Sequence, residues 1–332
     1  MNFRDIIGQS PLVENLQRSI RLGRVVHAYL ISGPKGAGKK MLAHIFARAL
    51  LCRHSGDRPC DACPSCIKYN TGNHPDVITV KAEKSSIVVD QIRDLQKDMY
   101  VKPYEGGRKI YLIEEVHTMT PQAQNCLLKT LEEPPAYGVI FLLADQLEGL
   151  LPTILSRCQI LRLKKVSRER IAALLEERYG LSPEQAHLIA ALSDGRVGRA
   201  LELAVDQDYM ELRREVLGRL EALAEADIMA VFNLVPFFTE HRDQQSLKLE
   251  ILEWWFRDVY IWKEMGDESL IVNQDAKELL EKQAELFTSS TVQDIIKRIE
   301  ESKKQLGSSV NAQFIMENLL LSIMEGKQTC LS

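Results

Sequence analysis

The run of residues 33–40, GPKGAGKK, constrains the fold of this chain more than any other feature of its sequence. It matches the phosphate-binding pattern G-x-x-x-x-G-K-[ST] at every position but the last. An apolar run precedes it at 27–31, and a run rich in Ala and Leu follows it at 39–51. Glycines between a strand and a helix let backbone N–H groups converge on phosphate oxygens at the helix N-terminus. The sequence therefore predicts a nucleotide-type α/β fold.

The last position of this pattern, Lys40, departs from the usual Ser or Thr. That hydroxyl ligates Mg²⁺ in nucleotide-binding proteins, whereas a lysine ammonium has no acceptor lone pair and repels a cation. We therefore expect a degenerate nucleotide site, and the residues leave open whether ATP and Mg²⁺ bind. The residues still expected to cradle phosphate groups are Gly33, Gly36, Gly38 and Lys39.

Short apolar runs alternate with amphipathic stretches from residue 27 to residue 163. Apolar positions recur at helical spacing between 87 and 100, and Thr120-Pro121 combines a capping residue with a proline at a helix start. Strands that alternate with helices predict a parallel sheet covered by helices on both faces. The predicted strands are 27–31, 76–80, 109–113, 139–143 and 159–163.

The length of the chain and a change in its sequence pattern after residue 163 predict more than one domain. The chain has 332 residues, which is more than one hydrophobic core usually serves. After residue 163 the clear strand patterns stop, and a helix at 247–262 that is apolar nearly all round is typical of a buried bundle element. We expect an α/β domain at 1–165, a small helical unit at 166–208 and an all-helical domain at 209–332.

The charge of the chain limits the partners that it attracts at long range. Its net charge is −4 and its pI is about 6.0, so the chain as a whole does not attract DNA. Its sequence contains no apolar run long enough to span a membrane. The N-terminal residues 1–5 lack the apolar core of a signal peptide. We therefore expect a cytoplasmic protein.

Four of the seven cysteines fall between residues 52 and 66. In a reducing compartment such clustering favours metal binding over disulfides. Four thiolates without an open position are typical of a structural Zn²⁺ site, with unligated thiols as the alternative. His54 is a substitute candidate for one ligand. The predicted ligands are Cys52, Cys60, Cys63 and Cys66.

Three further charged residues follow predicted strands. Glu114 and Glu115 end the strand at 109–113, where nucleotide hydrolases have one acid that holds Mg²⁺ through water and a second that polarises the attacking water. Glu115 fits the second role, provided that the chain hydrolyses nucleotide, while Glu114 stands where a shorter Asp is usual. Arg157 follows the fourth strand, and an arginine at a subunit edge can reach a neighbour's γ-phosphate. The alternative for each of these residues is that it is an ordinary charged side chain in contact with solvent, without a catalytic role.

Taken in order, the motifs of this chain resemble those of clamp-loader ATPases of the AAA+ superfamily. The resemblance covers residues 1 to about 205, and the C-terminal third is compatible with the helical collar of that family. Its most specific parts are the Glu-Glu-Pro-Pro and Ser-Arg-Cys sequences. The matching segments are 7–9 (IGQ), 27–29 (HAY), the phosphate loop, the cysteine cluster, 125–135 (NCLLKTLEEPP) and 151–158 (LPTILSRC).

Four departures from the motor subunits of that family affect ATP hydrolysis. Lys40 replaces Ser or Thr, Glu114 replaces Asp, and residues 144–145 are Ala-Asp instead of a Thr pair. Gly198 stands where motors carry a sensor Arg, whereas Arg157 and the cysteine cluster are intact. This combination resembles the delta-prime family, the non-hydrolysing stator subunits of bacterial DNA polymerase III.

The resemblance implies three domains, which are an AAA+ domain, a helical lid and a helical collar for oligomerisation. It implies a ring shared with gamma or tau motor subunits and the delta subunit, which loads the sliding clamp onto primer-template DNA. Arg157 would then act in trans as an arginine finger in a motor's ATP site, and Zn²⁺ would be structural. DNA contacts made by this acidic chain itself would be weak.

Three other functions remain open at this point. Lys39 and Glu115 are compatible with a working ATPase, a motor subunit of the same family. A zinc-bearing nucleotide kinase would need a phosphate-acceptor pocket, for which the sequence offers no suitable basic cluster. A DNA-binding module built on the cysteine cluster is disfavoured by the acidic residues Asp57 and Asp61.

Overall fold

The computed structural model describes residues 2–83, 85–105, 107–224, 228–306 and 310–328. The chain groups into two compact units. The first comprises residues 1–171 and 193–200, and the second comprises residues 172–192 and 201–332. The three-domain division stays a prediction, and residues 329–332 of its last part lie outside the described residues.

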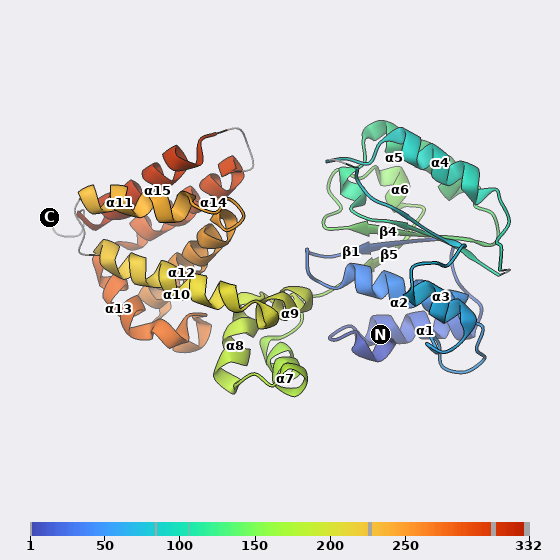
Figure 1. The fold of residues 1–332 in the computed structure, drawn as a ribbon, viewed down its shortest axis with the longest axis horizontal. Coiled ribbons are helices and arrows are strands. Elements are labelled where there is room, and N and C mark those ends of the chain that lie inside the picture. The colour runs from blue at the N-terminus through green and yellow to red at the C-terminus, as the bar shows by residue number, and fades with distance from the viewer. Residues whose placement is uncertain (1, 84, 106, 225–227, 307–309, 329–332) are drawn as a thin grey trace. The chain divides into compact units, whose positions relative to one another are not determined.

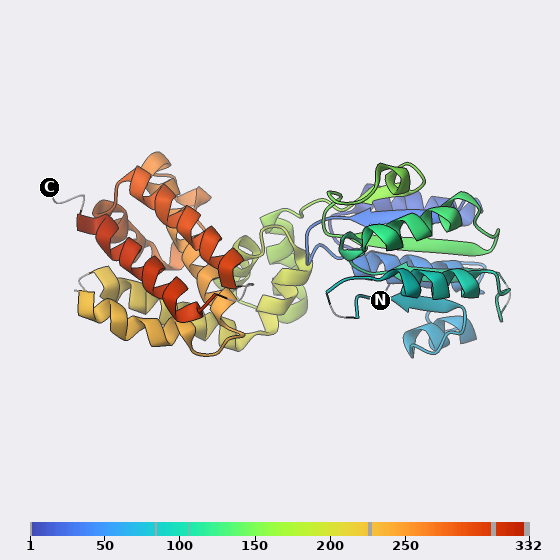
Figure 2. The same cartoon turned by 90° about the horizontal axis from the view of Figure 1, so that it is seen from above.

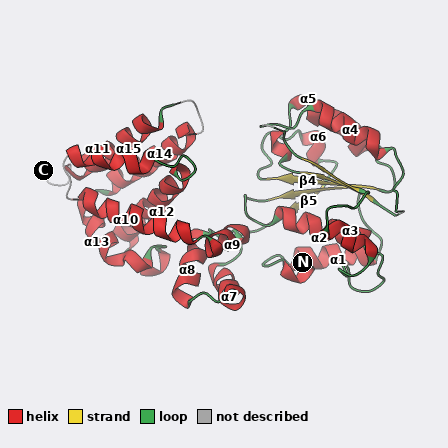
Figure 3. Cartoon of the chain, in the orientation of Figure 1, coloured by secondary structure: helices red, strands yellow, loops and turns green. Residues whose placement is uncertain are grey.

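The first unit is built on a five-stranded parallel sheet with the strand order β2-β3-β4-β1-β5. The predicted parallel α/β fold is therefore confirmed (Figures 1 and 3). The three central strands are buried along their whole length, as expected for a parallel sheet covered on both faces. The strands are β1 (Ala28–Ser32), β2 (Val77–Val80), β3 (Lys109–Ile113), β4 (Gly138–Ala144) and β5 (Gln159–Arg162).

Helices cover both faces of this sheet. They are α1 (Ser10–Arg21), α2 (Lys39–Leu51), α3 (Pro64–Asn70), α4 (Val89–Met99), α5 (Pro121–Glu132) and α6 (Pro152–Leu155). Residues of α4 and α5 share one core with Leu30 of β1, and residues of α1 and α2 share the other core with Tyr29 (Figures 1 and 2). Successive residues of a strand point to opposite faces, which is why Tyr29 and Leu30 enter different cores.

The carboxyl ends of the parallel strands meet at one edge of the sheet. The phosphate loop follows β1 and Lys81 follows β2, while Glu114 and Asp145 follow β3 and β4. In open parallel sheets this is the edge at which ligands bind. The topology therefore gathers charged residues from four separate segments around the phosphate loop.

The chain after β5 is helical throughout the residues that the structure describes. The apolar stretch at 247–262 lies in a helix that buries Trp255 and Phe256, which confirms its prediction as a bundle element. No helix among the described residues is long and apolar enough to cross a membrane. These helices are α7 (Arg168–Tyr179), α8 (Pro183–Leu192), α9 (Val197–Val205), α10 (Gln207–Ala224), α11 (Ile228–Thr239), α12 (Gln245–Met265), α13 (Lys277–Leu286), α14 (Ser289–Leu306) and α15 (Ala312–Gln328).

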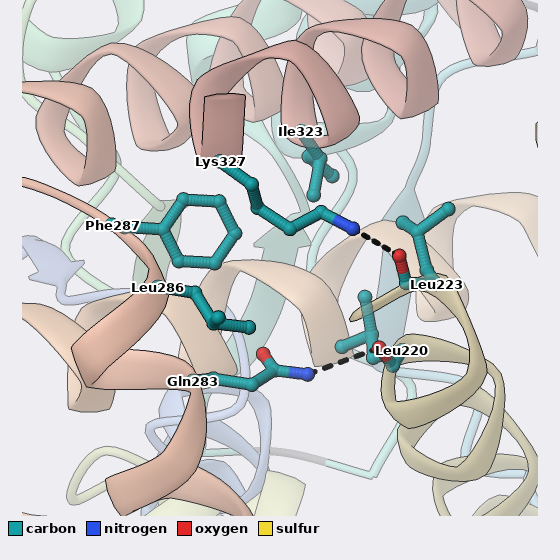
Figure 4. Close-up of a pocket in the computed structure, with 7 residues that line it drawn as sticks. All are labelled: Leu220, Leu223, Gln283, Leu286, Phe287, Ile323 and Lys327. Carbon is teal, nitrogen blue, oxygen red and sulfur yellow. Dashed lines mark hydrogen bonds between the residues drawn. The ribbon is translucent and has the colours of Figure 1, made fainter. Parts of the chain in front are cut away.

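Side chains from two other helices close the C-terminal end of α10 (Figure 4). Gln283 of α13 donates its Nε2–H to the carbonyl of Leu220 at 3.0 Å, and Lys327 of α15 donates to the carbonyl of Leu223. The last four carbonyls of a helix, here including that of Leu223, have no partners within it, and the helix dipole favours a cation beside them. The cavity left between these side chains is about 10 Å³, which is space for one water molecule at most.

We expect Gln283→Leu to destabilise the second unit by about 1–3 kcal/mol. Gln283 also accepts a hydrogen bond from Trp255 Nε1 at 2.7 Å, so its loss leaves this buried indole N–H unpaired. All three tryptophans lie in α12, so tryptophan fluorescence during urea unfolding reports on this unit. Lys282→Leu, at an exposed position of the same helix, is the control. Equal unfolding midpoints for the two variants would contradict the prediction.

Candidate functional site

The phosphate loop joins β1 to α2 through backbone conformations that favour glycine. Gly36 and Gly38 have φ angles of 81° and 90°, in the left-handed region where other residues are strained. Gly38 is the N-cap of α2, so the loop leads directly into the N-terminus of a helix. The backbone shape of a phosphate cradle is therefore present, and its role in nucleotide binding stays a prediction.

The lysine of this loop is engaged by its own chain. Lys39 is 9% exposed, and its Nζ lies 2.6 Å from Oδ1 of Asp145. The same nitrogen donates to the carbonyls of Gly33 at 2.6 Å and Pro34 at 2.8 Å. A phosphate group would have to replace the Asp145 carboxylate beside this cation. The sequence marks Asp145 as a departure from the motor pattern but carries no signal that it pairs with Lys39.

Lys40 places an ammonium group against the acid that follows β3. Its Nζ lies 3.0 Å from Oε1 and 3.2 Å from Oε2 of Glu114. The Nζ of Lys81, which follows β2, lies 3.6 Å from Oε1 of the same carboxylate. Nucleotide hydrolases hold Mg²⁺ between a loop hydroxyl and the acid at this place. Here the hydroxyl is absent and two ammonium groups flank the acid, so these residues do not fit Mg²⁺.

Glu115, the acid predicted to polarise water in a hydrolysing enzyme, precedes a short 3-10 helix, η2 (Val116–Thr118). Its φ angle is 51°, which is uncommon for a residue other than glycine. The carbonyl of Glu115 accepts hydrogen bonds from the backbone N–H of Thr118 at 2.8 Å and from its hydroxyl at 2.9 Å. These contacts fix the backbone of Glu115, whose side chain is exposed and whose catalytic role stays a prediction.

The start of α9 packs directly on the phosphate loop. The backbone N–H of Gly198 donates to the carbonyl of Gly36 at 2.8 Å. A Cβ atom at position 198 would lie 2.8 Å from that carbonyl oxygen and 3.3 Å from Gly36 Cα, which is closer than such atoms pack. Glycine therefore stands where the resemblance places a motor's sensor Arg, and any side chain there would displace the loop or α9.

The four predicted metal ligands come together, with all their sulfur atoms within 4.8 Å of one another. Cys52 follows α2, and Cys66 lies in α3. Four sulfurs placed about 2.3 Å from a tetrahedral Zn²⁺ would be about 3.8 Å apart, so the donor set and its spacing fit a metal ion. His54, the substitute candidate, accepts a hydrogen bond from the Gly56 N–H at 2.9 Å.

Two of these thiols ionise more readily than an ordinary cysteine. Burial opposes ionisation of Cys63, but backbone N–H groups of Cys66 and Arg53 donate to its sulfur and lower its pKa to about 6. Two backbone N–H groups of the loop likewise lower the pKa of Cys60. Burial raises the pKa of the other two thiols, Cys52 and Cys66. Thiolates are the metal-binding form, and a bound cation would favour ionisation of the buried pair.

Charged side chains of the surrounding segments contact the cysteine loop. Arg48 of α2 is 6% exposed, and it lies 2.9 Å from Asp61 of the loop. Glu105, which lies between α4 and β3, accepts hydrogen bonds from Arg53 at 2.8 Å and from Lys68 of α3. These contacts join the cysteine loop to two neighbouring segments. Neither Arg48 nor Glu105 belongs to a pattern that marks it in the sequence.

Arg157 lies at the opposite edge of the sheet from the phosphate loop. It precedes β5, in which Gln159 lies opposite Tyr29 of β1, whereas the loop begins after the end of β1. At about 3.3 Å per strand residue, roughly 20 Å separates Arg157 from Lys39 along the sheet, beyond the reach of one side chain. Arg157 therefore cannot act on a nucleotide at the phosphate loop of its own chain.

The side chain of Arg157 contacts two helices and remains 34% exposed. Its Nη2 lies 2.7 Å from Oε1 of Glu132, at the end of α5. Its Nη1 donates to the carbonyl of Thr153 in α6 at 3.1 Å and to the Ser156 hydroxyl oxygen at 3.3 Å. Glu132 belongs to the Glu-Glu-Pro-Pro sequence, but that motif alone does not indicate which residue its acids contact.

Comparisons with known proteins match most of the chain. The profile of the family described as DNA polymerase III, delta subunit, matches residues 8–167, and that of DNA polymerase III, delta subunit, C terminal, matches residues 207–325. DNA polymerase III subunit delta' of Bacillus subtilis is 34% identical over 322 residues, which are 96% of this chain and 97% of that protein.

The similarity extends to longer proteins and to solved structures. DNA polymerase III subunit tau of Bacillus subtilis is 28% identical over 97% of this chain, which spans 61% of tau. The crystal structure of a DNA polymerase III gamma subunit-related protein from Thermotoga maritima matches with a TM-score of 0.51 and 20% identity, over 94% of this chain and 99% of that one. That likeness shows a shared fold.

We expect Asp145→Asn to strengthen nucleotide binding by about tenfold, because it removes the charge that competes with phosphate for Lys39. Fluorescence anisotropy of a labelled ADP, titrated with and without Mg²⁺, measures the affinity. Mg²⁺ should not tighten binding in either protein, because Lys40 and Glu114 form an ion pair. Glu148→Gln, an exposed acid in the same connection, is the matched control. Unchanged affinity, or binding that requires Mg²⁺, would count against this account.

Proposed function

This chain belongs to the delta-prime family of DNA polymerase III clamp-loader subunits, and we propose that it completes a neighbour's ATP site instead of hydrolysing ATP itself. As the stator of the ring, it helps to load the sliding clamp onto primed DNA. Its partners are the gamma or tau motor subunits and the delta subunit. It meets the clamp and primer-template DNA through the assembled complex, in the cytoplasm.

The contrast between the two edges of the sheet carries this proposal. At the carboxyl edge, Lys39 pairs with Asp145 and Lys40 pairs with Glu114. At the amino edge, Arg157 presents a partly exposed guanidinium that is too far from the phosphate loop to act there. Because Arg157 does not reach the phosphate loop of its own chain, its position supports a role at the ATP site of an adjacent subunit. The same ion pairs count against the alternative, a hydrolysing gamma- or tau-like motor.

In the assembled ring, Arg157 would place its N–H groups on the γ-phosphate oxygens of ATP bound to the adjacent motor subunit. Negative charge on those oxygens must be stabilised as the phosphoryl group leaves, and a positioned guanidinium does this. Fingers of this kind raise turnover by roughly 10³–10⁵. The contribution of this chain is thus one cation, presented at the end of α6, while the motor supplies the nucleotide site.

The division of labour among the domains is part of the same proposal. The AAA+ domain at 1–165 carries the finger, and the lid at 166–208 packs its segment around Gly198 against the phosphate loop. The collar at 209–332 would supply the contacts that close the ring. In the second unit α10, α11, α13 and α14 pack against α12, which supports a rigid element suited to that task.

We further infer that the cysteine group holds a structural Zn²⁺. Four thiolates close the coordination shell and leave no position for a substrate or a reactive water. The ion would tie the end of α2, at Cys52, to α3, at Cys66. Most residues between Arg53 and Ala62 are exposed, so this loop has little apolar burial of its own, and metal binding would stabilise it.

We expect Arg157→Ala to remove fast hydrolysis at one ATP site of a reconstituted clamp loader. Rapid-quench measurement in the presence of primed DNA should show a burst smaller by one ATP per complex, since that site loses its finger. Gel filtration checks that the ring still assembles. Arg162→Ala, at an exposed position of β5, is the control and should leave the burst intact. An unchanged burst with Arg157→Ala would mean that the chain is a scaffold or an ATPase itself.

We expect the purified chain to hold one Zn²⁺ per molecule and Cys63→Ser to lose it, because three thiolates bind the ion more weakly than four. Elemental analysis of the protein measures the stoichiometry. The variant should also melt at a lower temperature, since metal binding contributes to folding free energy. Cys126→Ser, outside the group, is the matched control and should retain the metal. A wild-type chain that carries no metal after growth with added zinc would contradict the assignment.

A further inference from the structure

The acid that contacts Arg157 comes from a different helix. Glu132 is the last residue of α5, whereas Arg157 follows α6. An acid at a helix C-terminus is disfavoured by the helix dipole, so helix stability alone does not account for Glu132. Its carboxylate lies 2.7 Å from Nη2 of Arg157. This ion pair offsets the unfavourable position of an acid at the helix end.

Buried contacts fix the two helices relative to each other, independently of this ion pair. Gln124 of α5 is 4% exposed. Its Oε1 accepts from the Leu151 N–H at 2.9 Å, and its Nε2 donates to the Gly149 carbonyl at 3.0 Å. Ile154 of α6 lies in the same hydrophobic core as Leu131 of α5. The backbones that carry the acid and the arginine are therefore held in place by the core.

We propose that Glu132 is a positioning residue for Arg157, orienting its guanidinium for the neighbouring ATP site; this inference rests on the proposed function. A guanidinium has five N–H groups. Contacts with Glu132, Thr153 and Ser156 involve three of them and leave two for phosphate oxygens. Arginine has a long side chain with many rotamers, and an acid on a fixed helix end narrows them before the phosphate arrives.

The strength of the ion pair determines whether Glu132 orients Arg157 or keeps it from contacting the phosphate. The Glu132 and Arg157 side chains are 50% and 34% exposed, and ion pairs at such exposure change an equilibrium by about fivefold at most. An arginine finger changes turnover by roughly 10³–10⁵. The charge that develops on the phosphate oxygens in the transition state therefore outweighs the ion pair, which still limits the conformations of the free Arg157 side chain. A residue of this kind speeds the chemical step modestly and does not block it.

The test is rapid-quench hydrolysis by a clamp loader reconstituted with the full-length chain and primed DNA. Glu132→Ala should slow the burst phase that depends on Arg157 by about fivefold, with unchanged burst amplitude and ATP affinity. Glu132→Gln keeps an oxygen that accepts the arginine hydrogen bond and should recover part of the rate. Glu133→Ala, the adjacent exposed acid, is the matched control and should keep the wild-type rate. In an Arg157→Ala background, Glu132→Ala should change nothing further.

The outcomes separate this inference from the proposed function. A wild-type rate with Glu132→Ala, a faster burst, or an equal loss in both backgrounds would overturn the positioning role and leave the finger in place. No effect of Arg157→Ala itself would overturn the proposed function and this inference together. Thermal melting of Glu132→Ala should match that of the wild-type chain. Should that variant fail to fold, Glu132→Lys, which places a like charge beside Arg157, replaces it, and a wild-type burst rate would overturn the inference.

Discussion

Balance of charge at the carboxyl edge of the parallel sheet is the constraint on which the first unit depends. The topology brings Lys39, Lys40, Glu114 and Asp145 to that edge, where Lys39 is buried and Lys40 is exposed. In nucleotide hydrolases, phosphates and Mg²⁺ take part in this balance. Here the side chains pair with one another, so the loop keeps its shape without a ligand. Under the proposed function, the reacting cation of this chain is instead Arg157, at the other end of the strands.

Lysines play a second structural role, at helix ends inside the folded units. Lys109 is fully buried and donates to the Asp98 carbonyl of α4 at 3.0 Å. Lys248 donates to the Glu240 carbonyl at 3.2 Å, beyond the end of α11, and burial lowers its pKa. With Lys327 at α10, each ammonium group lies against carbonyls that lack helical partners. These three lysines therefore serve helix ends, and burial of a lysine is by itself no sign of a functional site.

Local sequence patterns are enough to predict the sheet, the phosphate loop and the cysteine group, because each depends on residues near one another along the chain. The helix predicted at 39–51 has those bounds in the structure. Pro64, at the first position of α3, is likewise a local helix-start signal. The pairing of Lys39 with Asp145 joins the segments after β1 and β4, and no periodicity marks it. Contacts between residues of distant segments depend on the order of the strands in the sheet, and local sequence patterns do not predict that order.

The close approach of Gly198 to Gly36 bears on how a chain of this kind can evolve. A mutation that restored a sensor side chain at position 198 would meet a carbonyl oxygen at 2.8 Å and damage the packing before it helped a nucleotide. A side chain at position 198 would therefore require the phosphate loop or the start of α9 to move as well. Packing alone thus limits which single substitutions this position accepts, whatever a new side chain would add to nucleotide binding.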